Sequence, residues 1–425
     1  MSEVDQIDPI DKLAGLIQTH VAGGGSVAGF ARDFGPHFDP ELLKAARARY
    51  ERSVGLIREL KDPAVLVDEK LKGKDWYGGP KSGDIFWPGL KGKLEPSLPA
   101  AALVSVDESS SKILNLMTPP GSLSIRTRGL VLGHVQSGKT TSFMSVAAKA
   151  ADVGYRLIIV LSGITDNLRS QTQDRLEEQL VGDDSKHKWI RLTTLDYDFQ
   201  AQVNAAAQLT SDQHRLLAVV KKNPYRLRRL AEWLESAGEA ALRSCPILII
   251  DDEADQASID VGKTRVSTIN KLIRRILDSP KAAYVAYTAT PFANLLIDPA
   301  EQEGLYPRNF IVNLPAGGDY YGPERLFGRN LLDHVEDDRT AEPDDVIRKV
   351  PDADIPAVQP PKGKGAVAHW QPEVAPSMAA AINWFVLATA ARWARGHTGA
   401  HSSMLIHTSM LADAHFLLKG VVDEH

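Results

Sequence analysis

The sequence predicts an α/β fold in which helices cover both faces of a largely parallel, doubly wound β-sheet. Three observations support this prediction. Short apolar runs recur along the middle of the chain, and a stretch with helical periodicity follows most of them. The runs are continuous, which is typical of parallel strands buried on both faces. The first run leads directly into a glycine-rich segment, and such segments join a strand to a helix in α/β proteins.

Composition narrows the class of protein before any motif is considered. The chain has 425 residues, enough for two or three domains, and a net charge of -5, so no global positive field attracts nucleic acid. The single cysteine, Cys245, excludes a disulfide framework and a cysteine-rich zinc site. The acidic N-terminus does not resemble a signal peptide, and no apolar run is long enough to span a bilayer. We therefore expect a cytoplasmic protein without a membrane partner.

Periodicity divides the chain into four expected regions. Residues 1–120 form a mostly helical N-terminal region, 121–300 the α/β lobe, 301–370 an irregular insertion or linker, and 371–425 the start of a second lobe. In the last region a helix is expected from Pro376 to about Arg395. A strand at 404–407 and the start of another helix follow it. Because these elements cannot bury a core of their own, we expect the folding unit to continue beyond residue 425.

The N-terminal region contains two helical patterns, at 13–21 and 40–60, followed by a loop rich in aromatic residues, glycine and proline. The aromatic side chains of this loop include Trp76 and Trp87. Aromatic residues in such a loop can stack on nucleic-acid bases, but they more often anchor a long loop to a core. We favour the anchoring role.

The α/β lobe is expected to contain five clear strands, at 129–132, 157–161, 216–220, 247–250 and 282–287. A further short strand is expected at 192–195. Asp166 or Asn167 is the expected N-cap of the helix that follows the second strand. Ligands of such sheets bind at the carboxyl ends of the strands, so the residues after each strand are the candidates for function.

The first strand is followed by the segment GHVQSGKT, which fits the phosphate-binding pattern GxxxxGK[ST] at every fixed position. Its backbone N–H groups and the helix N-terminus form a cradle for the phosphates of a nucleoside triphosphate. Lys139 is expected to reach the β- and γ-phosphates, and the Thr140 hydroxyl to ligate Mg²⁺. The residues expected to bind the nucleotide are Gly133, Gln136, Ser137, Gly138, Lys139, Thr140 and Thr141.

The strand at 247–250 ends in the acidic run Asp251-Asp252-Glu253-Ala254-Asp255. ATP hydrolysis requires a carboxylate for Mg²⁺ and a base for water, and we assign these roles to Asp252 and Glu253. The alternative is an acidic loop that caps the next helix. Strand periodicity leaves open whether Asp251 or Asp252 faces the metal, because a shift of one residue reverses the face. The phosphate turn and the acidic turn are expected to rise from neighbouring strands.

Two threonines, Thr288 and Thr290, follow the strand at 282–287. Their hydroxyls can hydrogen-bond the acidic run and sense the γ-phosphate, although threonine and proline are also common turn residues. A basic run lies after the strand at 216–220: Lys221, Lys222, Arg226, Arg228 and Arg229. Phosphate binding and a solvated helix face explain that run equally well.

The order GKT, DEAD, TAT resembles superfamily 2 helicases, and longer strings such as CPILIIDDEADQAS and AAYVAYTATPFANLLIDP resemble the bacterial Z-one domain endonuclease family. The resemblance covers most of residues 76–425 discontinuously. It implies a RecA-like P-loop ATPase lobe at 121–300 and an incomplete second RecA-like lobe. ATP and Mg²⁺ are the implied cofactors, and the arginine-bearing motifs would lie beyond His425. It also implies nucleic-acid contacts at Gly163, Asn167, Arg169 and Gln171.

These observations favour an ATP-hydrolysing motor or remodeller of nucleic acid, with DNA as the expected partner. Its role in bacterial DNA defence or repair, and a partner nuclease or defence-system protein, are implied by the resemblance alone. One alternative is an ATP-binding switch that recruits a separate nuclease. Another is an endonuclease whose site forms only in the full-length protein, since the residues contain no nuclease constellation beyond the acidic run assigned to ATP. A GTPase is disfavoured because no NKxD-type motif follows.

Overall fold

The computed structural model describes most of the chain, which divides into two compact units, Met1–Tyr320 and Tyr321–His425. The described residues are 9–22, 30, 34–55, 65–67, 75–133, 138–181, 189–200, 204–256, 267–295, 297, 304–315, 321–328, 345–363, 365–399 and 401–425.

An eight-stranded sheet organises the first unit, with strand order β1-β8-β2-β7-β6-β3-β5-β4. Every pair is parallel except β1 with β8. The strands are β1 (Val65–Val67), β2 (Arg128–Leu132), β3 (Leu157–Ser162), β4 (Trp189–Arg191), β5 (Arg215–Lys221), β6 (Ile247–Asp252), β7 (Ala282–Thr288) and β8 (Phe310–Asn313). The predicted α/β class with a doubly wound parallel sheet is therefore confirmed.

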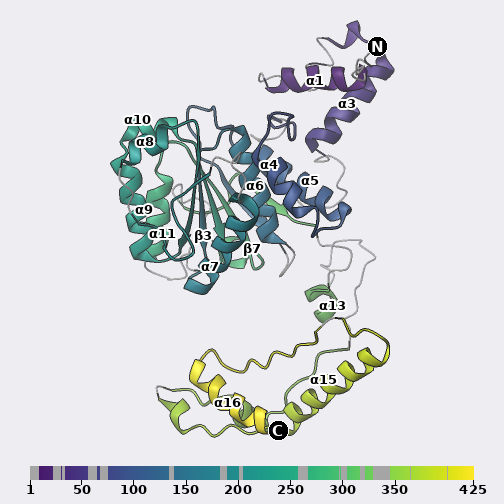
Figure 1. Ribbon diagram of the computed structural model, residues 1–425, viewed down its shortest axis with the longest axis vertical. Helices are drawn as coiled ribbons and strands as arrows, with labels where there is room; N and C mark the ends of the chain where they lie inside the picture. The colour runs from purple at the N-terminus through teal and green to yellow at the C-terminus, as the bar shows by residue number, and fades with distance from the viewer. Residues whose placement is uncertain are drawn as a thin grey trace. The chain divides into compact units, whose positions relative to one another are not determined.

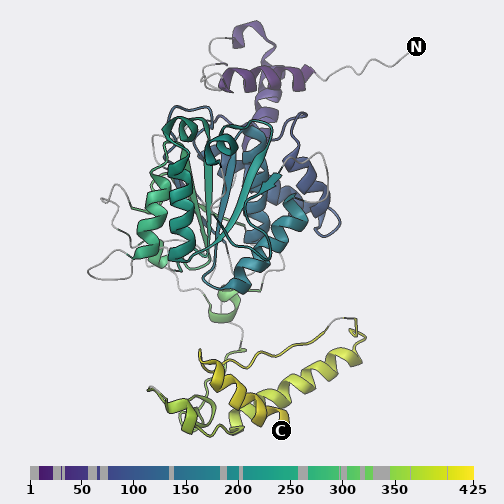
Figure 2. The ribbon, with the colours of Figure 1, turned by 60° about the vertical axis from the view of Figure 1, so that its left-hand side comes forward.

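Helices cover both faces of this sheet (Figures 1 and 2). The helices on one face are α4 (Phe86–Leu94), α5 (Ala100–Leu116) and α6 (Lys139–Val153), which share a core with the sheet. Those on the other face are α8 (Ala205–Thr210), α9 (Pro224–Ser236), α10 (Glu239–Ser244) and α11 (Thr268–Leu277). The strands alternate between the two cores, since Ile158 and Val160 face the first and Leu157 and Ile159 the second.

The five clear strands lie where the apolar runs predicted them. The structure differs from the prediction in the position of a short strand, in the N-cap of one helix and in two additional short helices. The short strand β4 ends at Arg191 and so precedes the predicted 192–195. The N-cap of α7 (Asp166–Arg175) is Thr165, whose side chain accepts the Leu168 N–H, and not Asp166 or Asn167. A π-helix, η3 (Leu176–Val181), continues α7, and the short α12 (Phe292–Leu295) follows β7.

The expected boundary near residue 120 does not separate two cores. The aromatic loop before α4 inserts Tyr77, Phe86 and Trp87 into the core that α6 shares with the sheet. Asp152, near the end of α6, accepts the N–H groups of Ile85, Phe86 and Trp87 at 2.8–2.9 Å. Its carboxylate thus satisfies free donors at the N-terminus of α4. The anchoring role of the aromatic residues is confirmed, and α4 and α5 are part of the α/β lobe.

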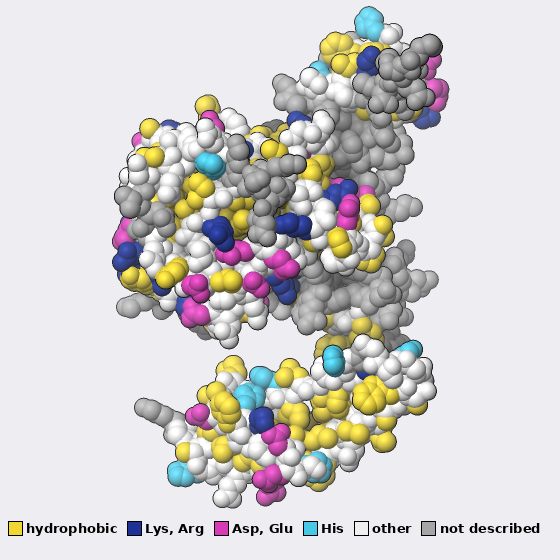
Figure 3. Space-filling model, viewed as in Figure 1, with side chains coloured by type: hydrophobic (Ala, Val, Ile, Leu, Met, Phe, Trp, Pro, Cys, Tyr) yellow, Lys and Arg dark blue, Asp and Glu magenta, His cyan; other side chains and the backbone are white. Residues whose placement is uncertain are grey.

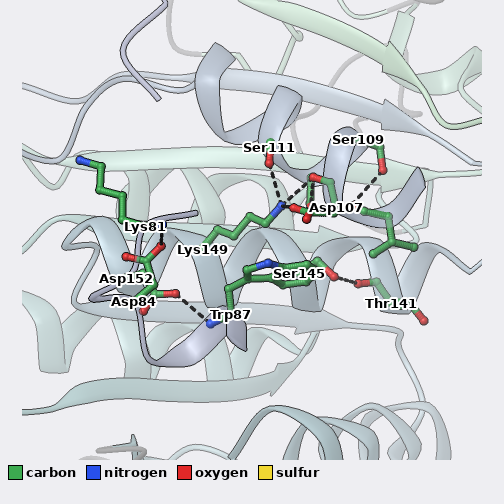
Figure 4. A network of polar contacts seen from close by, with 12 residues as sticks. Lys81, Asp84, Trp87, Asp107, Ser109, Ser111, Thr141, Ser145, Lys149 and Asp152 are labelled. Carbon is green, nitrogen blue, oxygen red and sulfur yellow. Dashed lines mark hydrogen bonds and ion pairs between the residues drawn. The ribbon is translucent and has the colours of Figure 1, made fainter. Parts of the chain in front are cut away.

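A buried ammonium group joins the same helices. Lys149 of α6 donates to the carbonyl and carboxylate oxygens of Asp107 at 2.6 and 2.5 Å and to the hydroxyls of Ser110 and Ser111 at 2.8 and 2.7 Å (Figure 4). Its nitrogen also lies 4.3 Å from the ring centroid of Trp87. Burial lowers the pKa of Lys149 to about 8, and Asp107 opposes that effect. A buried charge is tolerated only with such partners, so this contact fixes α5 against α6.

Two strands were not predicted. β8 comes from the stretch expected to be irregular, and β1 from the region expected to be mostly helical. Both are short, with four and three residues, and periodicity carries little signal over such lengths. β8 pairs in parallel with β2, the strand that leads to the phosphate turn.

At the N-terminus, α1 (Pro9–Ala22) and α3 (Pro40–Gly55) form an apolar cluster of their own, and the short η1 (Gly35–His37) precedes α3. The two predicted helices are therefore present; residues 56–60 of the second prediction lie outside the described part of the chain.

The second unit contains helices and connecting segments. They are α13 (Pro323–Phe327), α14 (Ile355–Val358), η4 (Ala366–His369), α15 (Pro376–Ala394) and α16 (Ala412–Glu424). The strand predicted at 404–407 is wrong: the described residues of this unit contain no strand with which it could form a ladder. A small core forms around Trp370, Ala414 and Leu418. Many apolar side chains remain exposed (Figure 3), among them Trp384 and Leu387 of α15. Across the described residues, no helix is long and apolar enough to cross a membrane.

The close approach of β2 and β8 gives a first prediction. A Cβ atom on Gly129 would lie 2.1 Å from Cζ of the buried Phe310 ring. We expect Gly129→Ala to lower the free energy of unfolding by about 1–3 kcal/mol, the usual cost of overpacking. Urea denaturation measures this change.

Gly92→Ala is the matched control, because a Cβ at this exposed position of α4 meets no atom within 4 Å. It should raise the free energy of unfolding by up to about 1 kcal/mol, because alanine has a higher helix propensity than glycine. Equal effects of the two substitutions would contradict the steric explanation.

Candidate nucleotide site at the carboxyl edge of the sheet

The predicted phosphate turn, threonines and acidic run follow β2, β7 and β6, which are consecutive parallel strands of the sheet. Their carboxyl ends therefore meet at one edge. The expectation that the phosphate and acidic turns rise from neighbouring strands is wrong, because β7 lies between them. Adjacent strands are about 4.8 Å apart, which separates the two turns by about 10 Å. The residues after β7 lie between the two turns.

The phosphate turn is held at both ends. The Gly133 N–H donates to the Thr288 carbonyl at 3.1 Å, which joins the start of the turn to the end of β7. Gly138 has φ +84°, a left-handed conformation in which glycine avoids strain, and α6 begins at Lys139. The Lys139 ammonium lies 3.5 Å from the Gly133 carbonyl oxygen, across the mouth of the turn. Gln136 and Ser137 lie outside the described residues.

Thr140 and Thr141 occupy the first turn of α6 and are half-buried. The Thr140 hydroxyl accepts a hydrogen bond at 3.4 Å from the guanidinium of Arg175, at the end of α7. Arg175 belongs to none of the predicted motifs. Its distance along the sequence from the phosphate turn fits no known motif. It reaches the site because of the way α7 packs.

The structure distinguishes the two aspartates that end β6. Both carboxylate oxygens of the buried Asp251 are occupied, one by the Lys222 ammonium at 2.9 Å and the other by the Tyr284 hydroxyl at 2.6 Å. Asp252, one residue later, points to the other side of the strand. Burial, and then the neighbouring Glu253, raise the pKa of Asp252 to about 6, while the charges of Lys222 and Lys139 oppose the rise. Asp252, and not Asp251, is therefore the candidate for the metal-facing position.

Glu253 has φ +52°, which is unusual for a residue with a side chain. Its N–H donates to a carboxylate oxygen of Asp252 at 3.1 Å. Its Oε2 atom is buried and accepts no hydrogen bond from any described residue. A buried carboxylate oxygen without a hydrogen bond, next to a second carboxylate, lowers the stability of the fold because it has lost its water. A divalent cation or a bound water at this position would offset that loss. Asp252 and Glu253 thus place two neighbouring carboxylates at this turn, and carboxylate oxygens are the donors that Mg²⁺ prefers.

The threonines after β7 contact the acidic run, as predicted. The hydroxyls of Thr288 and Thr290 donate to the two carboxylate oxygens of Asp255 at 2.8 and 2.7 Å. Asp255 was part of the predicted acidic run but had no role assigned to it. The structure makes it the link between the ends of β6 and β7.

Of the residues expected to contact nucleic acid, some lie at the surface and others are buried. Asn167 and Gln171 are exposed on α7, and Lys221 pairs with Asp166 at 2.6 Å near the surface. Gly163 is buried under Leu168, and a Cβ there would lie 2.6 Å from the Leu168 side chain.

Two of the expected nucleic-acid contacts need correction. Arg169 is buried, and its guanidinium donates to the carbonyls of Thr194 and Leu195 at 2.9 and 2.6 Å. The Lys222 side chain has no exposed surface. Sequence position alone cannot show that a basic side chain at a strand end turns inward to a carboxylate. Both side chains therefore make hydrogen bonds inside the protein, and neither lies at a surface that a nucleic acid could contact.

The lobe is thus an α/β fold in which the phosphate-binding pattern follows β2, the acidic run follows β6 and the threonines follow β7. Residues 377–425 match the family model of the Z1 domain. The predicted resemblance to the Z-one domain family is thus confirmed in the C-terminal part of the chain. A comparison with curated proteins gave no match.

Two solved structures are similar to part of the chain. The DUF1998 helicase MrfA bound to DNA is 13% identical with a TM-score of 0.35; the match covers 56% of this chain and 30% of that one. Mss116p bound to ssRNA and AMP-PNP is 15% identical with a TM-score of 0.30, over 58% of this chain and 48% of that one. This chain therefore spans less than half of the length of either structure.

The raised pKa of Asp252 gives a second prediction. Its carboxyl group is mostly neutral below about pH 6, and a neutral carboxyl group is a poor ligand for the Mg²⁺ expected at this site. The affinity for Mg²⁺ with a nucleotide should therefore fall about tenfold between pH 7 and pH 5. Calorimetric titration measures this dependence.

Asp252→Asn should bind Mg²⁺–nucleotide weakly and with a shallower acid limb, which then reflects only protonation of the terminal phosphate of the nucleotide. An affinity of the unaltered protein that stays constant from pH 7 to pH 5 would argue against Asp252 as a metal ligand.

Proposed function

We propose that the chain binds and hydrolyses ATP and is part of a motor or remodeller that acts on nucleic acid. One observation carries the proposal: the turn that bears Lys139 and the turn that bears Asp252 and Glu253 flank a single strand, β7. The charge of Lys139 acts on the pKa of Asp252, so the two turns share one electrostatic environment. A triphosphate fits between an ammonium group on one side and paired carboxylates on the other.

In this site each side chain has a distinct role. The Lys139 ammonium neutralises charge on the β- and γ-phosphates, and the Thr140 hydroxyl and Asp252 hold Mg²⁺. Bound Mg²⁺ supplies Lewis acidity at the terminal phosphate. The Glu253 carboxylate orients the attacking water and takes its proton. The contacts of Asp255 with Thr288 and Thr290 connect this acidic turn to β7, and the Gly133–Thr288 bond connects β7 to the phosphate turn.

The nucleic-acid part of the proposal rests on exposed residues that follow β3 and β5. Asn167 and Gln171 lie on α7, and Tyr225 at the start of α9 is 51% exposed. The guanidinium carbons of Arg226 and Arg229 lie 5.4 and 5.2 Å from the centroid of the Tyr225 ring. An exposed ring beside guanidinium groups is suited to stacking on a base while the charges contact phosphates. We propose DNA as the partner, in line with the resemblance.

ATP turnover tests the proposal most directly. The full-length protein should hydrolyse ATP, faster with DNA. Lys139→Ala should lose nucleotide affinity, and Glu253→Gln should keep affinity but lose about 100-fold or more in kcat, since only the latter removes the base alone. Phosphate release and nucleotide titration measure the two quantities.

The outcomes separate the proposal from its alternatives. Tight ATP binding without turnover would favour a regulatory switch that recruits a separate nuclease. DNA cleavage that persists in Glu253→Gln would locate nuclease chemistry elsewhere in the full-length protein. Turnover that is equal in all three proteins would contradict the site.

Arg229→Ala tests the proposed DNA surface. It should weaken single-stranded DNA binding and reduce the slope of log affinity against log salt by about 1, the effect of one lost phosphate contact. Arg243→Ala removes the same charge from α10, which precedes β6 and so lies at the opposite edge of the sheet. It should leave the slope unchanged in fluorescence anisotropy titrations; equal effects of both variants would exclude a local contact.

A further inference from the structure

A second buried ammonium group lies directly behind the acidic turn. Lys222 directly follows β5, which β3 separates from β6, and its side chain has no exposed surface. Its nitrogen donates to the Asp251 carboxylate at 2.9 Å and to the carbonyl oxygens of Asp252 and Glu253, both at 2.7 Å. The three donors of the ammonium are thus matched by three acceptors.

The Asp251 carboxylate completes this arrangement. Its side chain also has no exposed surface, and its second oxygen accepts the Tyr284 hydroxyl at 2.6 Å. Tyr284 belongs to β7, so the network links β5, β6 and β7 beneath the site. A buried ion pair is retained only with such complete hydrogen bonding, because each charge has lost its water.

The two carbonyls held by Lys222 belong to the residues whose carboxylates face the proposed metal site. Glu253 is also in the left-handed region, with φ +52°, which residues with side chains rarely adopt. Such a conformation persists only where its surroundings hold it. Lys222 bonds the carbonyls of the two peptide groups that flank the Glu253 Cα atom, and the Asp252 carboxylate accepts the Glu253 N–H. These three bonds stabilise the conformation of Glu253.

We propose that Lys222 is the positioning residue of this site: it fixes the backbone of Asp252 and Glu253 so that the Glu253 carboxylate faces the attacking water. This inference rests on the proposed ATP hydrolysis and deepens it. Lys222 does not contact the nucleotide, and its effect is on the rate of hydrolysis and not on nucleotide affinity.

The test substitutes Lys222→Met, which keeps the length of the side chain and removes its charge and donors. We expect kcat for ATP to fall about 100-fold, the cost of displacing a catalytic group by about 1 Å. Nucleotide affinity at pH 8 should change less than about threefold, because Lys139 is untouched.

Lys149→Met is the matched control. Among the described residues of this lobe, Lys149 is the other fully buried ammonium paired with a carboxylate, but its acceptors are on α5 and not on the acidic turn. It should lower the melting temperature while kcat stays within about threefold of the unaltered protein at a temperature where both are folded.

A double variant separates positioning from loss of stability. Lys222→Met with Asp251→Asn removes both buried charges and so restores stability relative to Lys222→Met alone. The carbonyls of the turn remain without their donor, so kcat should stay low. Recovery of kcat together with stability would overturn the proposal, as would a Lys222→Met protein with normal kcat. If the unaltered protein itself shows no ATP turnover, the proposed function fails instead.

Discussion

The contact on which the candidate site depends is the buried ion pair between Lys222 and Asp251. It lies where three parallel strands end, and an unpaired charge there would be unstable because water is excluded. The pair satisfies carbonyls that the tight turn after β6 would otherwise bury without partners. The same contact therefore contributes to the stability of the sheet and determines the path of the chain that carries Glu253.

The two buried ammonium groups, Lys149 and Lys222, make similar hydrogen bonds but stabilise different parts of the lobe. Lys149 fixes two helices that cover one face of the sheet, far from the turns at its carboxyl edge. Lys222 fixes a turn at that edge. Between them, hydrogen bonds from Gly133 to Thr288 and from Thr288 to Asp255 join the phosphate turn to the acidic turn through β7. A change at one turn can thus reach the other through a short series of contacts.

Long apolar runs and motifs at fixed spacing made the sheet and the outline of the site predictable from sequence, because a buried parallel strand leaves a strong signal. The short strands β1 and β8 were missed, since three or four residues carry little periodicity. The strand expected at 404–407 had the right composition but no partner strand among the described residues. The inward turn of Lys222 and Arg169, and the approach of Arg175 to Thr140, depend on packing that no local pattern encodes.

The pairing of β8 with β2 has a consequence for recombinant work on the isolated lobe. A fragment cut at residues 121 and 300, the limits that periodicity indicates, would lose β8 and leave one side of β2 without its hydrogen-bonding neighbour. It would also lose α4 and α5 from one of the two cores. An open strand edge invites intermolecular pairing, so such a fragment should aggregate, whereas one spanning 65–315 retains the whole sheet.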